Sequence, residues 1–140
     1  EFRRVLFRSA EPVNPQKQFL ADNGKREGWK TTPSGLQYYV EKAADHAQPT
    51  PTATSEVTVN YEGKLIDGTV FDSSYARNEP ATFLLNGVIP GWAEGVALMR
   101  KGEVFDFAIP SELAYGDRNV GPIPPGSTLL FKVELLDFKP

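Results

Sequence analysis

The feature of the sequence that most constrains its fold is an alternation of apolar and polar residues in several separate segments. Val57, Val59 and Tyr61 are separated by single polar residues, and the same period of two returns in residues 104–109 and 128–138. Neighbouring side chains on a strand point to opposite faces of a sheet, so this period predicts strands with one buried face. The 12 glycines and 12 prolines interrupt the chain too often for a helical bundle, and we therefore expect many short strands.

One hairpin turn, one further strand and one short helix are predicted between these segments. Asp67-Gly68 lies between two apolar pairs and is a strong hairpin-turn signal. Residues 81–85 form another short strand-like segment. Residues 91–100 carry apolar residues at the spacing of one helical face, with Gly102 as a stop signal. The residues of that face are Trp92, Val96 and Met99.

The order of these elements predicts the fold class. Runs of strands with a single helix indicate an α+β domain, in which five or six antiparallel strands pack on that short helix. Residues 110–127 join the last two strands as one long loop rich in glycine and proline. A loop of this length without secondary structure of its own is usually functional in a compact domain, so we expect it to contribute to a site.

The N-terminal part of the chain differs from the rest and is divided here into two segments. Residues 1–9 hold three arginines among apolar residues and begin with Glu-Phe, which a common restriction site encodes. We interpret them as a non-native segment, a cloning scar or a sequencing artefact, and exclude them from fold reasoning. Residues 10–34 are interpreted as a linker with the remnant of an N-terminal helix, because residues 15–29 combine helix formers with later glycines. The folded domain is expected to span residues 35–140.

Several kinds of chemistry are excluded because the necessary residues are absent or solitary. The chain has no cysteine, so disulfides, thiolate zinc sites and cysteine nucleophiles are excluded. His46 is the only histidine, and we interpret it as a solvated loop residue, which leaves neither a zinc ligand set nor a serine–histidine triad. No phosphate-binding or dinucleotide-binding motif is present. We therefore expect a protein without a metal or a cofactor.

The charge and hydropathy of the chain exclude two further classes of partner. The formal net charge is −3 and the pI is about 5.2, whereas nucleic-acid-binding domains usually carry a basic excess. No apolar run approaches the roughly 20 residues that span a bilayer, and no signal peptide is recognisable at the N-terminus. We expect neither nucleic-acid binding nor membrane insertion.

Asp67, Asp72 and Asp106 occupy turn or strand positions, where exposure of the carboxylate to solvent is the default expectation.

Large aromatic residues from different predicted elements are the remaining candidates for a site. They are Tyr61, Phe71, Phe83, Trp92, Tyr115 and Phe131. Core packing is the simplest interpretation of each one alone. However, Tyr115 lies in the long loop, where a large aromatic side chain is expected to pack over another part of the molecule or over a ligand. In addition, Asp72 directly follows Phe71. A buried carboxylate needs partners, and Tyr61 and Arg77 are the candidates.

Five motifs together carry a resemblance to a known family. They are VNYEG (59–63), GTVFDSS (68–74), VIPGW (88–92), ELAYG (112–116) and IPPGSTLLF (123–131). In this order and spacing they resemble the FKBP family of peptidyl-prolyl cis-trans isomerases over about residues 35–138. Residues 19–39 are similar to the linker that leads into the FKBP domain of bacterial Mip-like and FkpA-like proteins. The resemblance implies an enzyme that accelerates the isomerisation of X-Pro bonds in protein folding.

The resemblance also implies a role for individual residues. The implied catalytic residues are Asp72, Tyr115, Tyr61 and Ile89. The implied substrate-binding residues are Phe71, Arg77, Phe83, Val88, Trp92, Ile123 and Phe131. Trp92 would form the floor of the pocket, and Ile123 would lie over the proline ring. The Tyr115 hydroxyl and the Ile89 N–H would each donate to a substrate carbonyl, while Asp72 would form hydrogen bonds near Tyr61 and Arg77.

Two functions stay open at this point. One is an active isomerase, and the other is a peptide-binding chaperone module of the same fold with weak turnover. The second stays open because Ala81 stands where some eukaryotic members have a pocket phenylalanine, although the nearby Phe83 would compensate in part.

Partners and location follow from the resemblance alone. The implied partners are proline-containing unfolded or partly folded polypeptides, with macrolide FKBP ligands as candidate small molecules. Mip-like and FkpA-like proteins have an N-terminal helical dimerisation domain that would be missing here, which implies a homodimer for the full-length protein. They are also exported, so the periplasm is the expected location, with the cytoplasm as the alternative.

Overall fold

A seven-stranded antiparallel sheet is the central element of the computed structural model, which describes residues 14–44 and 49–139. Its strands are β1 (Lys30–Thr31), β2 (Gln37–Lys42), β3 (Glu56–Leu65), β4 (Val70–Ser73), β5 (Ala81–Leu84), β6 (Val104–Ile109) and β7 (Leu129–Lys139). They lie in the order β1-β2-β6-β7-β3-β4, and β5 also pairs with β3. The segment of residues 1–9 and His46, both interpreted above from sequence, lie outside the described residues.

β3 organises the sheet because it pairs with three other strands. One edge of β3 pairs with β7 along its whole length. The other edge is shared, since residues 56–59 pair with β5 and residues 62–64 pair with β4. The chain between β4 and β5 must therefore turn away from the sheet and return to it. This detour carries side chains to the end of the sheet where the site is described below.

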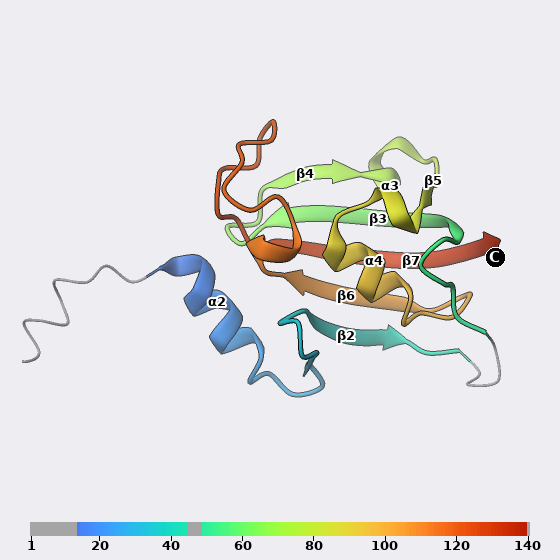
Figure 1. The fold of residues 1–140 in the computed structure, drawn as a ribbon, viewed down its shortest axis with the longest axis horizontal. Coiled ribbons are helices and arrows are strands. Elements are labelled where there is room, and N and C mark those ends of the chain that lie inside the picture. Colours follow the sequence, from blue (N-terminus) through green and yellow to red (C-terminus); the bar gives the residue numbers. More distant parts are fainter. Residues whose placement is uncertain (1–13, 45–48, 140) are drawn as a thin grey trace, which may run out of the picture.

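Three α-helices accompany the sheet in the described part of the chain, namely α2 (Pro15–Asn23), α3 (Ser74–Arg77) and α4 (Pro90–Val96). Figure 1 shows α4 lying across one face of the sheet. The fold class predicted from the sequence is confirmed. The extra strand is the two-residue β1, which pairs with β2 and lies in the segment interpreted from sequence as a linker. None of the described helices is long and apolar enough to cross a membrane.

The core lies between α4 and the inner face of the sheet. Alternate residues of β3, β6 and β7 face it, as the period of two predicted, and the three residues assigned to the buried helical face are 0–4% exposed. The buried side chains are Val57, Val59, Tyr61, Phe105, Phe107, Ile109, Leu129, Phe131, Val133, Leu135, Trp92, Val96 and Met99.

α4 packs very closely on β6 because two of its residues have no side chain. A Cβ atom on Gly91 would lie 2.5 Å from Ile109, and one on Gly95 would lie 2.5 Å from Phe107. The helix is shorter than the predicted residues 91–100, since it ends at Val96. Tight turns continue it, and the Met99 N–H donates to the Val96 carbonyl over 3.0 Å, so Met99 stays on the buried side.

The N-terminal helix α2 is fixed to the sheet by side-chain hydrogen bonds. It begins after Asn14, whose side chain accepts from the Gln16 N–H at 2.9 Å, and it ends at Asn23, directly before Gly24, the first of the later glycines. The Gln16 side chain accepts from the Thr128 N–H at 2.7 Å, and Asn23 donates to Gln37 over 2.8 Å. The division of the chain at residue 35 stays a prediction.

Candidate active site

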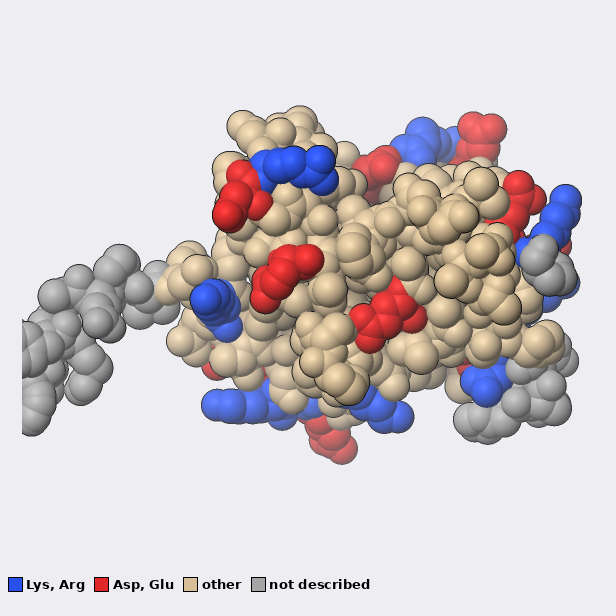
Figure 2. Space-filling view, viewed as in Figure 1, with Lys and Arg blue, Asp and Glu red and all other residues tan. Residues whose placement is uncertain are grey.

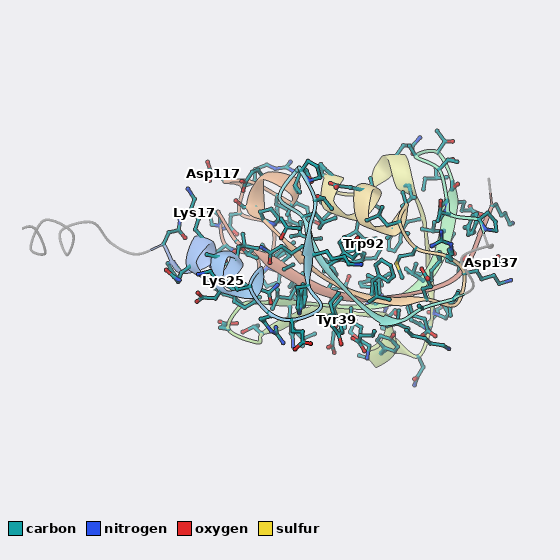
Figure 3. All side chains as sticks on the ribbon, turned by 90° about the horizontal axis from the view of Figure 1, so that it is seen from below. Lys17, Lys25, Tyr39, Trp92, Asp117 and Asp137 are labelled. Carbon is teal, nitrogen blue, oxygen red and sulfur yellow. The ribbon has the colours of Figure 1, made fainter. Side chains whose placement is uncertain are left out.

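A cavity of about 510 Å³ opens between α4, the long loop and the edge of the sheet formed by β4 and β5. Thirteen residues line it, and most are aromatic or aliphatic. They are Tyr61, Phe71, Asp72, Phe83, Gly87, Val88, Ile89, Pro90, Trp92, Ala114, Tyr115, Arg118 and Phe131. Figure 3 places Trp92 between α4 and the sheet, at the base of this region.

Trp92 is packed edge-on against three other rings. Its ring centroid lies 5.3 Å from that of Tyr61, 5.4 Å from Phe83 and 5.3 Å from Phe131, with interplanar angles of 86°, 80° and 86°. Edge-to-face pairs of this kind are favourable beyond the apolar area that they bury. Proline at the first position of α4 and glycine next to it explain how the VIPGW motif positions this ring, because the helix begins at Pro90 and approaches the sheet at Gly91.

Gly63 makes room for the aromatic wall on the opposite side. Phe71 and Phe131 meet edge to face with centroids 5.7 Å apart. A Cβ atom on Gly63 would lie 2.6 Å from the Phe131 ring and 2.7 Å from the Phe71 ring. Since Tyr61 and Gly63 are two positions apart on one strand, they share the inner face. The VNYEG motif therefore supplies one ring to the cavity and the space for two others.

A hydrogen-bonded ion pair lies at the edge of the cavity. The Tyr61 hydroxyl donates to Asp72 Oδ2 over 2.5 Å. The Arg77 guanidinium donates to Asp72 Oδ1 over 2.6 Å and to the Tyr61 hydroxyl oxygen over 3.2 Å. The guanidinium carbon also lies 5.9 Å from the Tyr61 ring centroid. The three side chains thus fix one another at the edge of an otherwise apolar cavity.

This arrangement shifts the pKa values of all three groups. Burial raises the pKa of Asp72, but the hydrogen bonds from Tyr61 and Arg77 outweigh burial and hold the pKa below its ordinary value. Burial, together with the hydrogen bond to Asp72, raises the pKa of the Tyr61 hydroxyl. The hydrogen bond to Asp72 raises the pKa of Arg77. At neutral pH the cluster therefore holds a carboxylate, a guanidinium cation and a neutral phenol.

α3 positions Arg77, and the sequence patterns did not predict this helix. The Ser73 hydroxyl caps it by accepting from the Ala76 N–H at 3.2 Å. The buried Ser74 hydroxyl accepts from the Tyr61 N–H at 2.8 Å and donates to Asn60 over 3.1 Å. Serine is a preferred helix N-cap residue, so the two serines of the GTVFDSS motif were the signal for this short helix.

Backbone hydrogen bonds give the long loop a defined conformation. Residues 111–113 form a turn of 3₁₀-helix. The Gly116 N–H donates to the Ser111 carbonyl, and the Gly126 N–H donates to the Gly116 carbonyl, each over 2.8 Å. Val120 and Ile123 form an isolated bridge. The expectation of a loop without secondary structure of its own was wrong, and these bonds fix the backbone that carries Tyr115.

The structure brings together nine of the eleven residues that the resemblance assigned to the site. Arg77 contacts Asp72 but does not line the cavity. Ile123 is 4% exposed, belongs to the core cluster and does not line the cavity either. Phe83 lines the cavity whereas Ala81 does not. The roles assigned to these residues stay predictions.

Four lining residues were missed by the sequence reasoning, namely Gly87, Pro90, Ala114 and Arg118. Three of them are adjacent in sequence to residues that were predicted to belong to the site, and this adjacency is the signal that could have identified them. Arg118 lies three positions beyond Tyr115, and only the turn after Tyr115, in which the Arg118 N–H donates to the Tyr115 carbonyl over 3.1 Å, returns it to the cavity.

Replacing Tyr115 by phenylalanine is expected to lower kcat/KM about 3- to 10-fold, the effect of losing one neutral hydrogen bond to substrate. An isomerisation assay on a proline peptide measures this. Tyr39→Phe is the matched control, because Tyr39 lies outside the cavity and stacks on Trp29 with centroids 5.8 Å apart. Equal kcat/KM for Tyr115→Phe and the wild type would remove Tyr115 from the site.

A second cavity, of about 500 Å³, lies beneath α2 on the other face of the sheet. Asp106 lines it, and the expectation of a solvated surface position for this residue was wrong. Burial, and then the hydrogen bond with Glu41, raise the pKa of Asp106 to about 7, against the opposing charges of Lys132 and Lys64. Between pH 3.8 and about 7, the folded chain therefore holds a proton at Asp106 that the unfolded chain releases.

Replacing Asp106 by asparagine is expected to stabilise the protein by about 1 kcal/mol at pH 8, after allowing for solvent screening of a half-exposed group. The neutral carboxyl favours folding fully below its ordinary pKa of 3.8, and this contribution is lost as pH rises through about 7. The gain should therefore vanish toward pH 4. Urea unfolding at both pH values measures it, with Asp137→Asn, at an exposed ion pair, as the control. A gain independent of pH would contradict the assignment.

The family of the chain follows from this fold and site together with comparisons to known proteins. The family model of the FKBP-type peptidyl-prolyl cis-trans isomerase matches residues 48–136, and the model of the domain amino terminal to it matches residues 8–40. The chain belongs to the FKBP-type peptidyl-prolyl cis-trans isomerase family. The family predicted from the motifs is thereby confirmed.

The most informative relatives are bacterial. The chain is 57% identical over 120 residues to FkpA of Aeromonas hydrophila, covering 86% of this chain and 44% of the relative. It is 54% identical over 121 residues to the 22 kDa FKBP-type isomerase of Escherichia coli, covering 86% and 58%. The crystal structure of Escherichia coli FkpA matches with a TM-score of 0.85 and 48% identity, covering 90% of this chain and 58% of that one. The chain spans about half the length of these relatives.

Proposed function

We propose that this chain catalyses cis-trans isomerisation of X-Pro bonds in unfolded or partly folded polypeptides, without a cofactor. The observation that carries the proposal is the cavity itself, with four edge-packed aromatic rings and a single internally paired carboxylate. Its size of about 510 Å³ falls within the range of small-ligand sites. A proline ring with its flanking peptide groups is a ligand of this chemistry.

The apolar walls of the cavity lower the barrier to rotation about the X-Pro bond. An X-Pro bond has partial double-bond character, with a barrier of about 18–20 kcal/mol. The planar amide separates charge between oxygen and nitrogen, and the twisted amide loses this separation. Water stabilises the planar form more, so a cavity that excludes water favours the twisted form, and this is preferential binding of the transition state. No bond is made or broken, and no nucleophile is needed.

Two donors at the cavity are suited to hold the flanking peptide groups. The carbonyl of Ile89 accepts from the Trp92 and Ala93 N–H groups at 3.0 and 3.1 Å, whereas none of the backbone hydrogen bonds of the described residues uses the Ile89 N–H. The Tyr115 hydroxyl is the second donor. With two carbonyl oxygens held, rotation is confined to the X-Pro bond. Asp72 holds the Tyr61 ring in place through its hydrogen bond.

A protease-coupled isomerisation assay tests the proposal. At micromolar protein, the slow phase of a peptide with one X-Pro bond should become faster in proportion to protein concentration. The alternative is a peptide-binding chaperone module of the same fold. An unchanged slow phase, combined with suppressed aggregation of an unfolded client protein, would overturn the enzyme and support that alternative.

Binding of a macrolide FKBP ligand is expected to quench the fluorescence of Trp92, because the ligand would cover the ring at the base of the cavity. Trp29 contributes background, so the titration is made in a Trp29→Phe variant. Saturable quenching that disappears in Trp92→Phe measures binding at this cavity. Quenching that persists in Trp92→Phe would place the ligand elsewhere.

We further propose that the full-length protein is a homodimer located in the bacterial periplasm. Support for the dimer comes from the match of residues 8–40 to the domain that precedes the isomerase domain in this family. Support for the location comes from the likeness to FkpA and to a Legionella longbeachae protein named outer membrane protein MIP. Light scattering of the full-length protein and cell fractionation test the two statements, and a monomer or a cytoplasmic protein would contradict them.

A further inference from the structure

Arg118 is the only charge at the cavity that is not paired within the described part of the chain. Asp72 also lines the cavity, but Arg77 compensates its charge over 2.6 Å. No hydrogen bond or ion pair joins the Arg118 side chain to another described residue. Of the two charged residues that line the cavity, Asp72 is therefore compensated by Arg77, and Arg118 has no partner among the described residues.

The backbone between Tyr115 and Arg118 is held by hydrogen bonds. The Arg118 N–H donates to the Tyr115 carbonyl over 3.1 Å, and the preceding turn is held by the bond from the Gly116 N–H to the Ser111 carbonyl. The side chain itself is exposed to solvent. Because the backbone is held in this way and Arg118 lines the cavity, its guanidinium lies within reach of a peptide whose proline occupies the cavity and whose flanking residues extend over the loop.

Asp117 and Glu112, the exposed acidic residues of the same loop, form no ion pair with Arg118 within the described part of the chain. Figure 2 shows acidic side chains near the middle of the face that bears α4, while most other Lys, Arg, Asp and Glu side chains lie toward its margins. A guanidinium binds a carboxylate with two parallel hydrogen bonds. The complementary ligand group is a carboxylate next to the proline.

We infer that Arg118 makes this cavity selective for proline segments that carry an acidic side chain adjacent to the proline. The inference rests on the proposed isomerase function and adds a substrate class to it. Arg118 acts here as a specificity residue, because it attracts the flanking side chain and takes no part in the rotation. Such an attraction lowers KM for acidic substrates more than it changes kcat.

Two peptide series test this inference in a protease-free assay, in which NMR exchange measures the isomerisation rate. The series are Ac-Ala-Xaa-Pro-Phe-Ala-NH₂ and Ac-Ala-Ala-Pro-Xaa-Ala-NH₂, with Glu, Gln or Lys as Xaa. For the wild type at low salt, kcat/KM for the Glu peptide should exceed that for the Lys peptide about 5-fold in one series, the order of magnitude of one exposed charge pair. The ratio should approach 1 in Arg118→Gln and invert in Arg118→Glu, and 0.5 M salt should reduce it.

Lys101→Glu is the matched control, because it makes the same change of charge at a distant site. Lys101 lies 3.7 Å from Asp137, and Figure 3 shows Asp137 and Asp117, the neighbour of Arg118, at opposite ends of the domain. This variant should keep the wild-type ratio. Equal rates for Glu and Lys peptides in both series, or a wild-type ratio in Arg118→Gln, would overturn the inference. A wild type that fails to accelerate even the Gln peptides would overturn the isomerase function as well.

Discussion

Replacing Asp72 by alanine is expected to lower kcat/KM about 10- to 100-fold while the domain stays folded. The carboxylate accepts hydrogen bonds from Tyr61 and Arg77 at 2.5 and 2.6 Å. Hydrogen bonds to charged groups contribute about 1.5–3 kcal/mol each, and here they set the orientation of a ring that lines the cavity. The side chains of Arg77 and Asp72 are 48% and 42% exposed, so the loss in folding free energy should stay near 1 kcal/mol or below.

Two further variants make the Asp72 experiment specific. Asp72→Asn keeps the shape but removes the charge, and we expect it to lie between the wild type and Asp72→Ala. Asp67→Ala removes an exposed carboxylate that accepts a hydrogen bond from the Thr69 N–H over 2.8 Å, and it should leave kcat/KM unchanged. Equal activity of Asp72→Ala and Asp67→Ala would exclude the ion pair from the mechanism.

The depressed pKa of Asp72 fixes the pH dependence of this effect. A carboxyl with a lowered folded pKa contributes fully above its ordinary value of 3.8 and loses its contribution as pH falls through the folded value. The activity ratio of wild type to Asp72→Ala should therefore be constant between about pH 5 and 8 and should fall only below pH 3.8. A ratio that changes near pH 6 or 7 would point to a different titrating group.

The strands and the central helix could be predicted because burial on one face leaves a period in the sequence. β3, β6 and β7 each bury one face, so their apolar residues alternate. α3 has four residues, too few for any period, and it could be found only through its serine cap. β1 has two residues and pairs through its backbone with β2, which leaves no side-chain pattern at all.

The members of the candidate site could be named, but their contacts could not. The motifs supply the rings of Tyr61, Trp92 and Phe131, while their edge-on packing depends on the space left by Gly63. Ile123 was expected over the proline ring and instead belongs to the core cluster. Arg118 was missed because backbone hydrogen bonds within the loop place it at the cavity. Such hydrogen bonds cannot be predicted from the residue types.

Asp106 illustrates a further limit of reasoning from single strands. Its position in β6 is polar and alternates with buried phenylalanines, which predicts exposure to water. The packing of α2 against the outer face of the sheet, together with Glu41 nearby, half-buries this carboxyl. The pKa of Asp106 therefore depends on contacts between distant parts of the chain, which the local residue pattern does not predict.

Replacing Trp92 by alanine is expected to lower the free energy of unfolding by about 3–5 kcal/mol, the cost of deleting a buried aromatic side chain. Trp92 is 4% exposed, and its loss removes three edge-to-face contacts at once. It also opens the base of the cavity to water, which would remove the preference for the twisted amide. In the folded fraction we expect kcat/KM to fall at least about 10-fold, the equivalent of 1.4 kcal/mol.

Trp29→Ala is the internal control that separates the cavity from aromatic loss in general. Trp29 stacks on Tyr39 with centroids 5.8 Å apart and lies 5.5 Å from the Arg26 guanidinium carbon, outside the candidate site. Its partial exposure limits the expected cost to about 1.5 kcal/mol, and kcat/KM should not change. Urea unfolding and the isomerisation assay measure both quantities for each variant. If both substitutions reduced activity equally, the effect would come from stability, and Trp92 would be a core residue rather than the base of the cavity.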